Sequence, residues 1–262
     1  MLWAARRLAA NRNLLKNLVL RDLKHRYVGS VGGFLWSVMH PVVLLVSYTF
    51  VFSVLGVRAG PELGIDSYPL FLFCGILPWL LFADTVTRNC SSITDNAQLI
   101  TKTVIPAEIL PIAITISNLV HHMIGFSVLI VVLIAFDGIH LSALWLLLHI
   151  PILLMLAQGV GWIVAGLHVF IRDTIHAVQI VMLPWFLFTP VLYSPDILSE
   201  RLRFIVNLNP MAIIVTGYRN SLLDLPQPGI TYIAAVFGVS LAVFLLGAFL
   251  FKQAKPAFAE IL

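Results

Sequence analysis

The sequence has little charge and almost no cysteine. Of its 262 residues only 11% are charged and 60% are hydrophobic, and the mean hydropathy is +0.99. A soluble domain carries roughly 25% charged residues, so this composition excludes a water-covered surface for most of the chain. Cys74 and Cys90 fall in one apolar stretch, without the spacing of metal ligands or the density of a disulfide framework. We interpret both as small buried hydrophobic side chains.

Enzyme motifs are missing as well. The sequence contains no Gly-rich phosphate loop, no HExxH and no GxSxG. We therefore expect that the chain binds no cofactor or metal and does not hydrolyse ATP by itself. The adjacent residues His121 and His122 point ~100° apart on a helix, which favours helix packing over metal binding. An intramembrane transferase that uses one of these histidines remains an alternative function.

Charges inside the apolar part of the chain are few and form no relay. Asp84 and Arg88 are four residues apart, so they share one helix face and are predicted to neutralise each other. We favour this structural pair over a direct substrate contact. Because an ion-coupled carrier needs intramembrane carboxylates or broken helices at mid-depth, the energy for transport is expected to come from a partner. A passive channel is the alternative.

Six apolar segments predict an all-α integral membrane protein, with a single transmembrane domain over residues 1–262. A spanning helix needs ~20 mainly apolar residues. The predicted spans are 34–57, 68–88, 109–136, 141–169, 175–193 and 230–251. Residues 252–262 form a short tail after the last span. Pro184 and Pro190 in the fifth span favour contact with other helices or a cavity rather than lipid.

The first 33 residues are basic and carry an apolar repeat every four residues, at Leu15, Val19, Leu23 and Tyr27. This pattern predicts a helix in the membrane interface with its apolar side toward lipid; a solvated basic leader is the alternative. Lys and Arg are concentrated in this segment and in the connections on the same side of the membrane, 12 against 4 on the other side. The bias predicts that both termini are cytoplasmic.

Two connections are longer than a helix bundle needs. The inside one, 89–108, is rich in Ser, Thr, Asn and Gln. The outside one, 194–229, is predicted to hold two short re-entrant helices, with starts at Ser194-Pro195-Asp196 and at Asn209-Pro210. Residues 211–215 are too short to span and too apolar for water, so we expect this part to pack into the outer mouth of the bundle.

Aromatic residues occur at mid-span and are not confined to interfacial belts. Lipid-facing bulk and anchoring at the interface are expected to explain at least half of them. The alternative is a path lined by uncharged aromatic faces, on which sugar rings stack without deep binding wells. The candidates for this lining are Tyr48, Phe52, Trp79, Phe82, Trp185, Phe188 and Tyr193.

Motifs spread along nearly the whole chain resemble the membrane subunit of type-2 ABC exporters for polysaccharides, the group that exports O-antigen, capsule and teichoic acid. The matching residues are Arg21–Tyr27, Gly32–Trp36, Pro41, Gly75–Trp79, Asn96, Leu99-Ile100, Lys102, Pro106, Pro111, Phe170–Asp173, Asn209-Pro210 and Arg219. Each motif is weak alone, but together they occur in the family's order among six matching spans. The motifs do not separate O-antigen from capsule or teichoic acid as cargo.

The resemblance implies a homodimer in the bacterial inner membrane, bound to two copies of a cytoplasmic ABC ATPase that uses ATP and Mg. It implies a lipid-linked glycan as cargo and no nucleic acid partner. An exporter of lipids or small lipophilic compounds is the alternative within the same family.

The resemblance also implies roles for particular residues. The segment 96–106 would be the coupling helix for the ATPase, with Asn96, Gln98, Lys102 and Pro106. The interface cations Arg21, Lys24 and Arg26 would attract the pyrophosphate of the lipid carrier, or alternatively anionic lipid headgroups. Asn209, Pro210 and Arg219 would belong to an outside gate.

Overall fold

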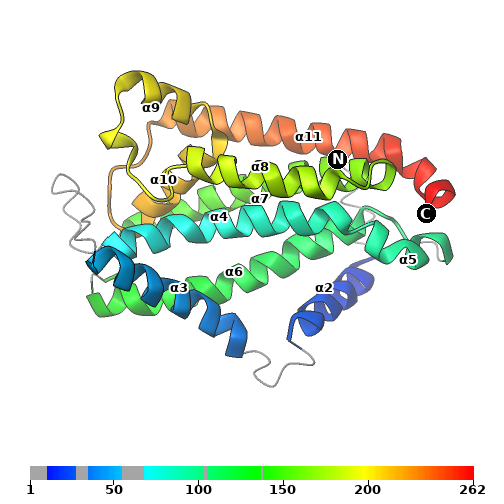
Figure 1. Cartoon of the computed structure of the whole chain (residues 1–262), viewed down its shortest axis with the longest axis horizontal. Helices are drawn as coiled ribbons and strands as arrows, with labels where there is room; N and C mark the ends of the chain where they lie inside the picture. The colour runs from blue at the N-terminus through cyan, green and yellow to red at the C-terminus, as the bar shows by residue number, and fades with distance from the viewer. Residues whose placement is uncertain (1–10, 28–34, 55–67, 103–104, 137) are drawn as a thin grey trace.

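The computed structural model describes residues 11–27, 35–54, 68–102, 105–136 and 138–262, and every regular element in these ranges is a helix. Four long helices lie lengthwise beside one another (Figure 1). They are α4 (Tyr68–Ser91), α6 (Ile109–Phe136), α7 (Leu146–Phe170) and α11 (Ile230–Ile261). The predicted all-α class is confirmed for this part of the chain.

Four helices are long and apolar enough to cross a membrane: Tyr68–Ser91, Ile109–Ala135, Leu141–Phe170 and Ile230–Phe258. They correspond to the second, third, fourth and sixth predicted spans. The described apolar parts at the first and fifth positions, Val42–Val51 in α3 (Leu35–Val54) and α8 (Thr174–Phe188), are shorter. Because α8 rises only about 22 Å, less than the ~30 Å hydrocarbon core, six crossings stay a prediction.

The fifth predicted segment ends earlier than expected. The apolar pattern predicts a span over 175–193, whereas α8 stops at Phe188 and Thr189 is already extended, with φ −96° and ψ 130°. Proline disfavours helical backbone at the residue before it, so Pro190 explains why the helix stops there. Pro184 lies inside α8.

Helices α7 and α11 touch through their backbones. A Cβ added at Gly247 would lie 2.2 Å from the carbonyl oxygen of Gly159, and one added at Gly159 would lie 2.7 Å from backbone atoms of Phe244. Small residues allow this close approach of helices in a membrane. We therefore treat α7 and α11 as one paired unit.

The short helices gather at the two ends of the bundle (Figure 1). The end that we call the α5 end carries a 3-10 turn (Thr94–Asn96), α5 (Ala97–Lys102) and the C-terminal turns of α11, with α2 (Arg12–Tyr27) beside α6. The opposite end, the α9 end, carries a 3-10 turn (Pro195–Ile197), α9 (Glu200–Asn207) and α10 (Pro210–Leu222). A further 3-10 turn, Leu141–Trp145, precedes α7.

Two apolar cores hold these parts together. The larger is built around α4, most of which is buried, with contributions from α7 and α10. The smaller lies at the α5 end and contains Leu18 of α2, with Leu15 and Val19 packed against it. The apolar stripe of α2 that was predicted to face lipid therefore contacts protein over part of its length. The predicted interface segment 1–33 otherwise includes 1–10 and 28–33, which lie outside the described residues.

Candidate functional site

Asp22 on α2 joins three helices at the α5 end. Its carboxylate accepts a hydrogen bond from Arg88 Nη2 of α4 at 2.5 Å and another from Ser117 Oγ of α6 at 2.5 Å. The Nε atom of Arg26, one turn later on α2, lies 3.6 Å from the same carboxylate. Charge-assisted bonds of this kind are roughly twice as strong as neutral ones, so Asp22 fixes how α2 lies on the bundle.

Asn118 of α6 completes this polar network. Its side-chain oxygen accepts from Arg88 Nη1 at 2.8 Å and from Arg26, and its amide nitrogen donates to Thr85 Oγ1 of α4 at 3.2 Å. Arg88 thus has partners on α2 and α6. The Asp84–Arg88 pair that the spacing predicts within α4 stays a prediction. In this connected network Asn118, Ser117 and Thr85 are buried, whereas the charged members are half-buried, and such a network favours one packing arrangement.

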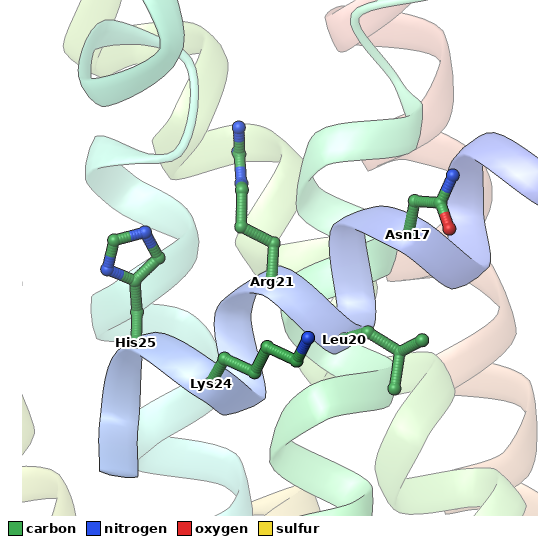
Figure 2. A pocket seen from close by; sticks show the side chains of 5 residues that line it. All are labelled: Asn17, Leu20, Arg21, Lys24 and His25. Atoms are coloured by element: carbon green, nitrogen blue, oxygen red, sulfur yellow. The ribbon is translucent and has the colours of Figure 1, made fainter. Parts of the chain in front are cut away.

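The three cations predicted to meet phosphate separate into two environments. Arg21 and Lys24 are exposed and line an open hollow of about 460 Å³ together with Asn17, Leu20 and His25. Figure 2 shows Arg21 and His25 rising on the same side of α2, with Lys24 extending on another. Arg26 instead points into the Asp22–Asn118 network. Only the first two cations of this set have the open surroundings that an incoming phosphate needs.

A second hollow of about 530 Å³ lies where α2 meets α4 and α6. Cations line it through Arg21 and Arg88, but so do the carboxylates of Asp22 and Asp95. The mixed charge does not favour an anion here as clearly as the outer hollow does. The hollow lies between α2 and the start of the predicted coupling segment.

The predicted coupling segment begins at a contact with α2. Asn96 closes the 3-10 turn before α5, and its side-chain oxygen accepts from Arg21 Nη2 at 2.6 Å. Gln98 is exposed on α5. The backbone of Pro106 accepts from Ile109 N at 3.0 Å and so leads into α6. Lys102 closes α5, but its side chain lies outside the described residues, so the role of this residue stays a prediction.

At the α9 end, Arg219 of α10 is buried, with 1% of its surface exposed. Its Nε donates to the carbonyl of Phe71 at 3.0 Å, and its Nη2 donates to the carbonyls of Pro190 and Val191 at 2.9 and 2.8 Å. The guanidinium also lies 3.7 Å from the centre of the Phe71 ring. Arg219 therefore fastens α10 to α4 and to the turn after α8.

Asn209 caps α10 as the sequence predicted, and Pro210 is the first residue of that helix. The Asn209 oxygen accepts from Met211 N and from Trp185 Nε1, each at 3.0 Å, and its amide nitrogen donates to Thr189 Oγ1 at 2.9 Å. The other predicted start, Ser194, caps only the 3-10 turn, and α9 begins at Glu200. A gating role for Asn209, Pro210 and Arg219 stays a prediction.

The aromatic residues predicted to line a path are distributed unevenly. Phe82 and Trp79 are 0% and 5% exposed, with ring centres 4.9 Å from Trp185 and 5.5 Å from Phe186, respectively. These two rings pack inside the chain and present almost no surface to a path. Phe188 is exposed, whereas Tyr48, Trp185 and Tyr193 are half-buried; the side chain of Phe52 lies outside the described residues.

Sequence reasoning missed the two residues that organise the network at the α5 end. Asp22 stood inside the quoted Arg21–Tyr27 motif, but only the cations of that motif were assigned a role. Asn118 carried no signal beyond being a polar residue in an apolar helix. His122 shows the packing environment expected for it, since it is buried with its Nε2 3.0 Å from the Tyr218 hydroxyl.

Long apolar helices side by side, with polar contacts concentrated at both ends, define a polytopic α-helical membrane protein. The chain belongs to the ABC-2 type transporter family, whose model matches residues 13–223. The match extends from the first turn of α2 to the end of α10 and leaves α11 outside it.

Named relatives extend this similarity to nearly the whole chain. The chain is 30% identical to the O-antigen export system permease protein RfbA of Myxococcus xanthus, over 99% of both chains. It is 31% identical to a protein of the same name from Klebsiella pneumoniae, over 95% of both. The polysialic acid transport protein KpsM of Escherichia coli is 22% identical over 79% of this chain and 80% of its own.

Proposed function

We propose that this chain is the transmembrane subunit of an ATP-driven exporter that carries a lipid-linked polysaccharide across the bacterial inner membrane. The observation that carries the proposal is the similarity over 99% of both chains to a permease named for O-antigen export. The more distant similarity to a polysialic acid transporter supports the same broad class of cargo. The working unit is a homodimer of this subunit with two copies of a cytoplasmic ABC ATPase.

In this proposal the α5 end faces the cytoplasm. The bias of Lys and Arg, 12 against 4, supports this orientation because basic residues are retained on the cytoplasmic side. The proposal includes both termini on the cytoplasmic side. The α9 end with its two short helices then faces outward, where it gates the path.

The ATPase docks on α5 and moves it. ATP binding closes the ATPase dimer, and α5 passes the movement on through the contacts at its start. Arg21 of α2 donates a 2.6 Å hydrogen bond to Asn96, and through this contact the movement of the coupling segment reaches α2. The Asp22–Arg88 bond ties α2 to α4, so the interface helix and the spans move together.

The exposed cations of α2 receive the cargo's phosphate. Arg21 and Lys24 line the open hollow, where a carrier pyrophosphate or an anionic lipid headgroup is attracted by the same charge. The glycan then follows a path between the two copies of the chain. Phe188 and Tyr193, which keep surface outside the aromatic cluster, are the best placed of the predicted lining residues.

The direct test starts from the chain purified with its native membrane partners. We expect an ABC ATPase to co-purify and its ATP hydrolysis to rise when lipid-linked glycan is added to the complex in liposomes. Stimulation by glycan-free lipids alone would favour the lipid exporter. Turnover without any ATPase, abolished by His122→Ala, would favour the intramembrane enzyme, and transport without ATP would favour a channel.

A further inference from the structure

An ion pair separate from the Asp22 network lies where the predicted coupling segment joins α6. Lys255 Nζ of α11 lies 2.7 Å from Glu108 Oε2, although the two residues are 147 positions apart in the sequence. The side chains of Lys255 and Glu108 are only 28% and 10% exposed. Because both charges are largely withdrawn from water, removing one partner leaves the other charge poorly solvated and uncompensated.

The surroundings of this pair hold it in a fixed place. Ala107, Ile109 and Leu110 on the α6 side belong to one buried cluster with Phe251 and Phe258 of α11. The rings of Phe251 and Phe258 meet edge to face at 5.4 Å. Lys255 lies between these two aromatic positions in sequence, so the ion pair is set within an apolar contact.

Helix α11 is also in direct contact with α7. The backbones of α7 and α11 touch at Gly159 and Gly247, and close-packed interiors transmit strain. Lys255 therefore connects Glu108 to a pair of long helices in direct contact. The start of the coupling segment is held differently, by Arg21 of α2 at Asn96.

We propose that the Lys255–Glu108 pair is a positioning contact that fastens the end of the coupling segment to the α7–α11 unit and transmits ATPase movement to it. The proposal rests on the proposed function, since it needs an ATPase acting on α5. The coupling segment is then held at its start by Arg21, through Asn96. Just after its end, it is held by Lys255, through Glu108. Lys255 lies beyond residues 13–223 that the family model matches.

The test uses charge reversal, because a pair that acts by attraction is restored when both charges are exchanged. The variants are Lys255→Glu, Glu108→Lys and the double exchange, each in the full chain complexed with its ATPase. Gln253→Glu is the control for a negative charge added at an exposed site of the same helix; it changes the net charge by −1, as Lys255→Gln does. If a reversal lowers the amount of complex, Lys255→Gln and Glu108→Gln serve in its place, because each removes one charge without introducing the opposite charge.

The quantity measured is glycan exported per ATP hydrolysed, at equal amounts of complex and with the thermal unfolding midpoint recorded. We expect the single reversals to lower this ratio by about two- to thirtyfold, the range that coupling contacts produce. We expect the double exchange to recover most of the loss and Gln253→Glu to match wild type. A structural role alone would lower the midpoint and leave the ratio intact.

The experiment distinguishes a failure of the positioning contact from a failure of the proposed function. If the wild-type complex exports glycan but the single variants keep the wild-type ratio, or the double exchange recovers none of the loss, the positioning contact is rejected and the proposed function stands. If the wild-type complex shows no ATP-dependent glycan export, the proposed function itself is rejected, and with it any role of Lys255 in coupling.

Discussion

The two ends of the bundle are held together by different kinds of polar contact. At the α5 end, charged side chains meet other side chains across helices, as in Asp22–Arg88 and Lys255–Glu108. At the α9 end, the buried cation Arg219 is satisfied by three backbone carbonyls. These two α5-end contacts involve side chains alone. The Arg219 contacts require the backbone itself to stay in place.

The difference agrees with what each end is proposed to do. An end that receives movement from a partner needs contacts that transmit force between separate helices. A buried cation held by carbonyls instead locks a short helix, α10, against α4 and the turn after α8. Substitutions at the two ends are therefore expected to change stability by different amounts.

The largest effect is expected for Arg219→Ala at the α9 end. The substitution leaves the carbonyls of Phe71, Pro190 and Val191 unpaired and opens a cavity, so we expect about 4 kcal/mol of lost stability. Thermal unfolding of the purified chain in detergent measures it. Arg219→Lys is the control, because a single ammonium keeps the charge but cannot span all three carbonyls in the same geometry; it should lie between wild type and Ala. An unchanged unfolding midpoint for the Ala variant would show that the α9 end is not locked by this residue.

A smaller loss is expected at the α5 end for Asp22→Ala. It leaves Arg88 and Arg26 facing each other without their shared carboxylate, which should cost about 2 kcal/mol. Detachment of α2 provides the specific readout, since limited proteolysis within α2 should become faster while cleavage near α9 stays the same. If proteolysis became faster to the same extent within α2 and near α9, Asp22 would not act locally on α2.

Gly75→Ala tests the Arg219 contact from the opposite side. The new Cβ would lie 2.2 Å from Arg219 Nη2 and 3.3 Å from the carbonyl oxygen of Val191, so the guanidinium must shift, at about 1–2 kcal/mol. Gly238→Ala is the matched control, because a Cβ there meets nothing within 4 Å among the described residues and alanine favours a helix. If both variants unfold at the same temperature, the close packing at Gly75 is not important for stability.

The smallest effect on stability is expected for Arg21→Ala. The residue is exposed and loses one hydrogen bond to Asn96, so the change should be about 0.5 kcal/mol. Export should fall much more than stability, because Arg21 is proposed both to contact the coupling segment and to attract phosphate. Lys16→Ala, another exposed cation of α2, serves as the control for lost charge. Equal export by the two variants would assign Arg21 only a general electrostatic role.

Features that are decided by residues close together in the sequence could be predicted. Apolar runs gave four helices long enough to cross a membrane, and Asn209-Pro210 gave the start of α10, because hydropathy and capping act within a few residues. The end of α8 was placed too late, although Pro190 carried the signal for an earlier stop.

Contacts between distant segments could not be predicted in the same way. Spacing within one helix predicts only the pair of Arg88 with Asp84, one turn away, and this pair stays a prediction. The contact of Arg88 with Asp22 of α2 appears only when the helices are packed. Phe82 and Phe188 have the same side chain and both lie in apolar helices, yet one is buried and the other exposed. In a membrane, lipid-facing and protein-facing surfaces are both apolar, so composition does not separate them.

The central claim is that the α5 end faces the cytoplasm and binds the ATPase. Gln98→Cys puts a thiol on the exposed face of α5, and background is low because the native Cys74 and Cys90 are buried. The measurement is labelling by a membrane-impermeant maleimide, with Ile197→Cys as the control at the α9 end. We predict that position 98 reacts only in inverted vesicles and is protected when the ATPase is bound, while position 197 reacts only in right-side-out vesicles. Labelling of position 98 from the external side would contradict the account.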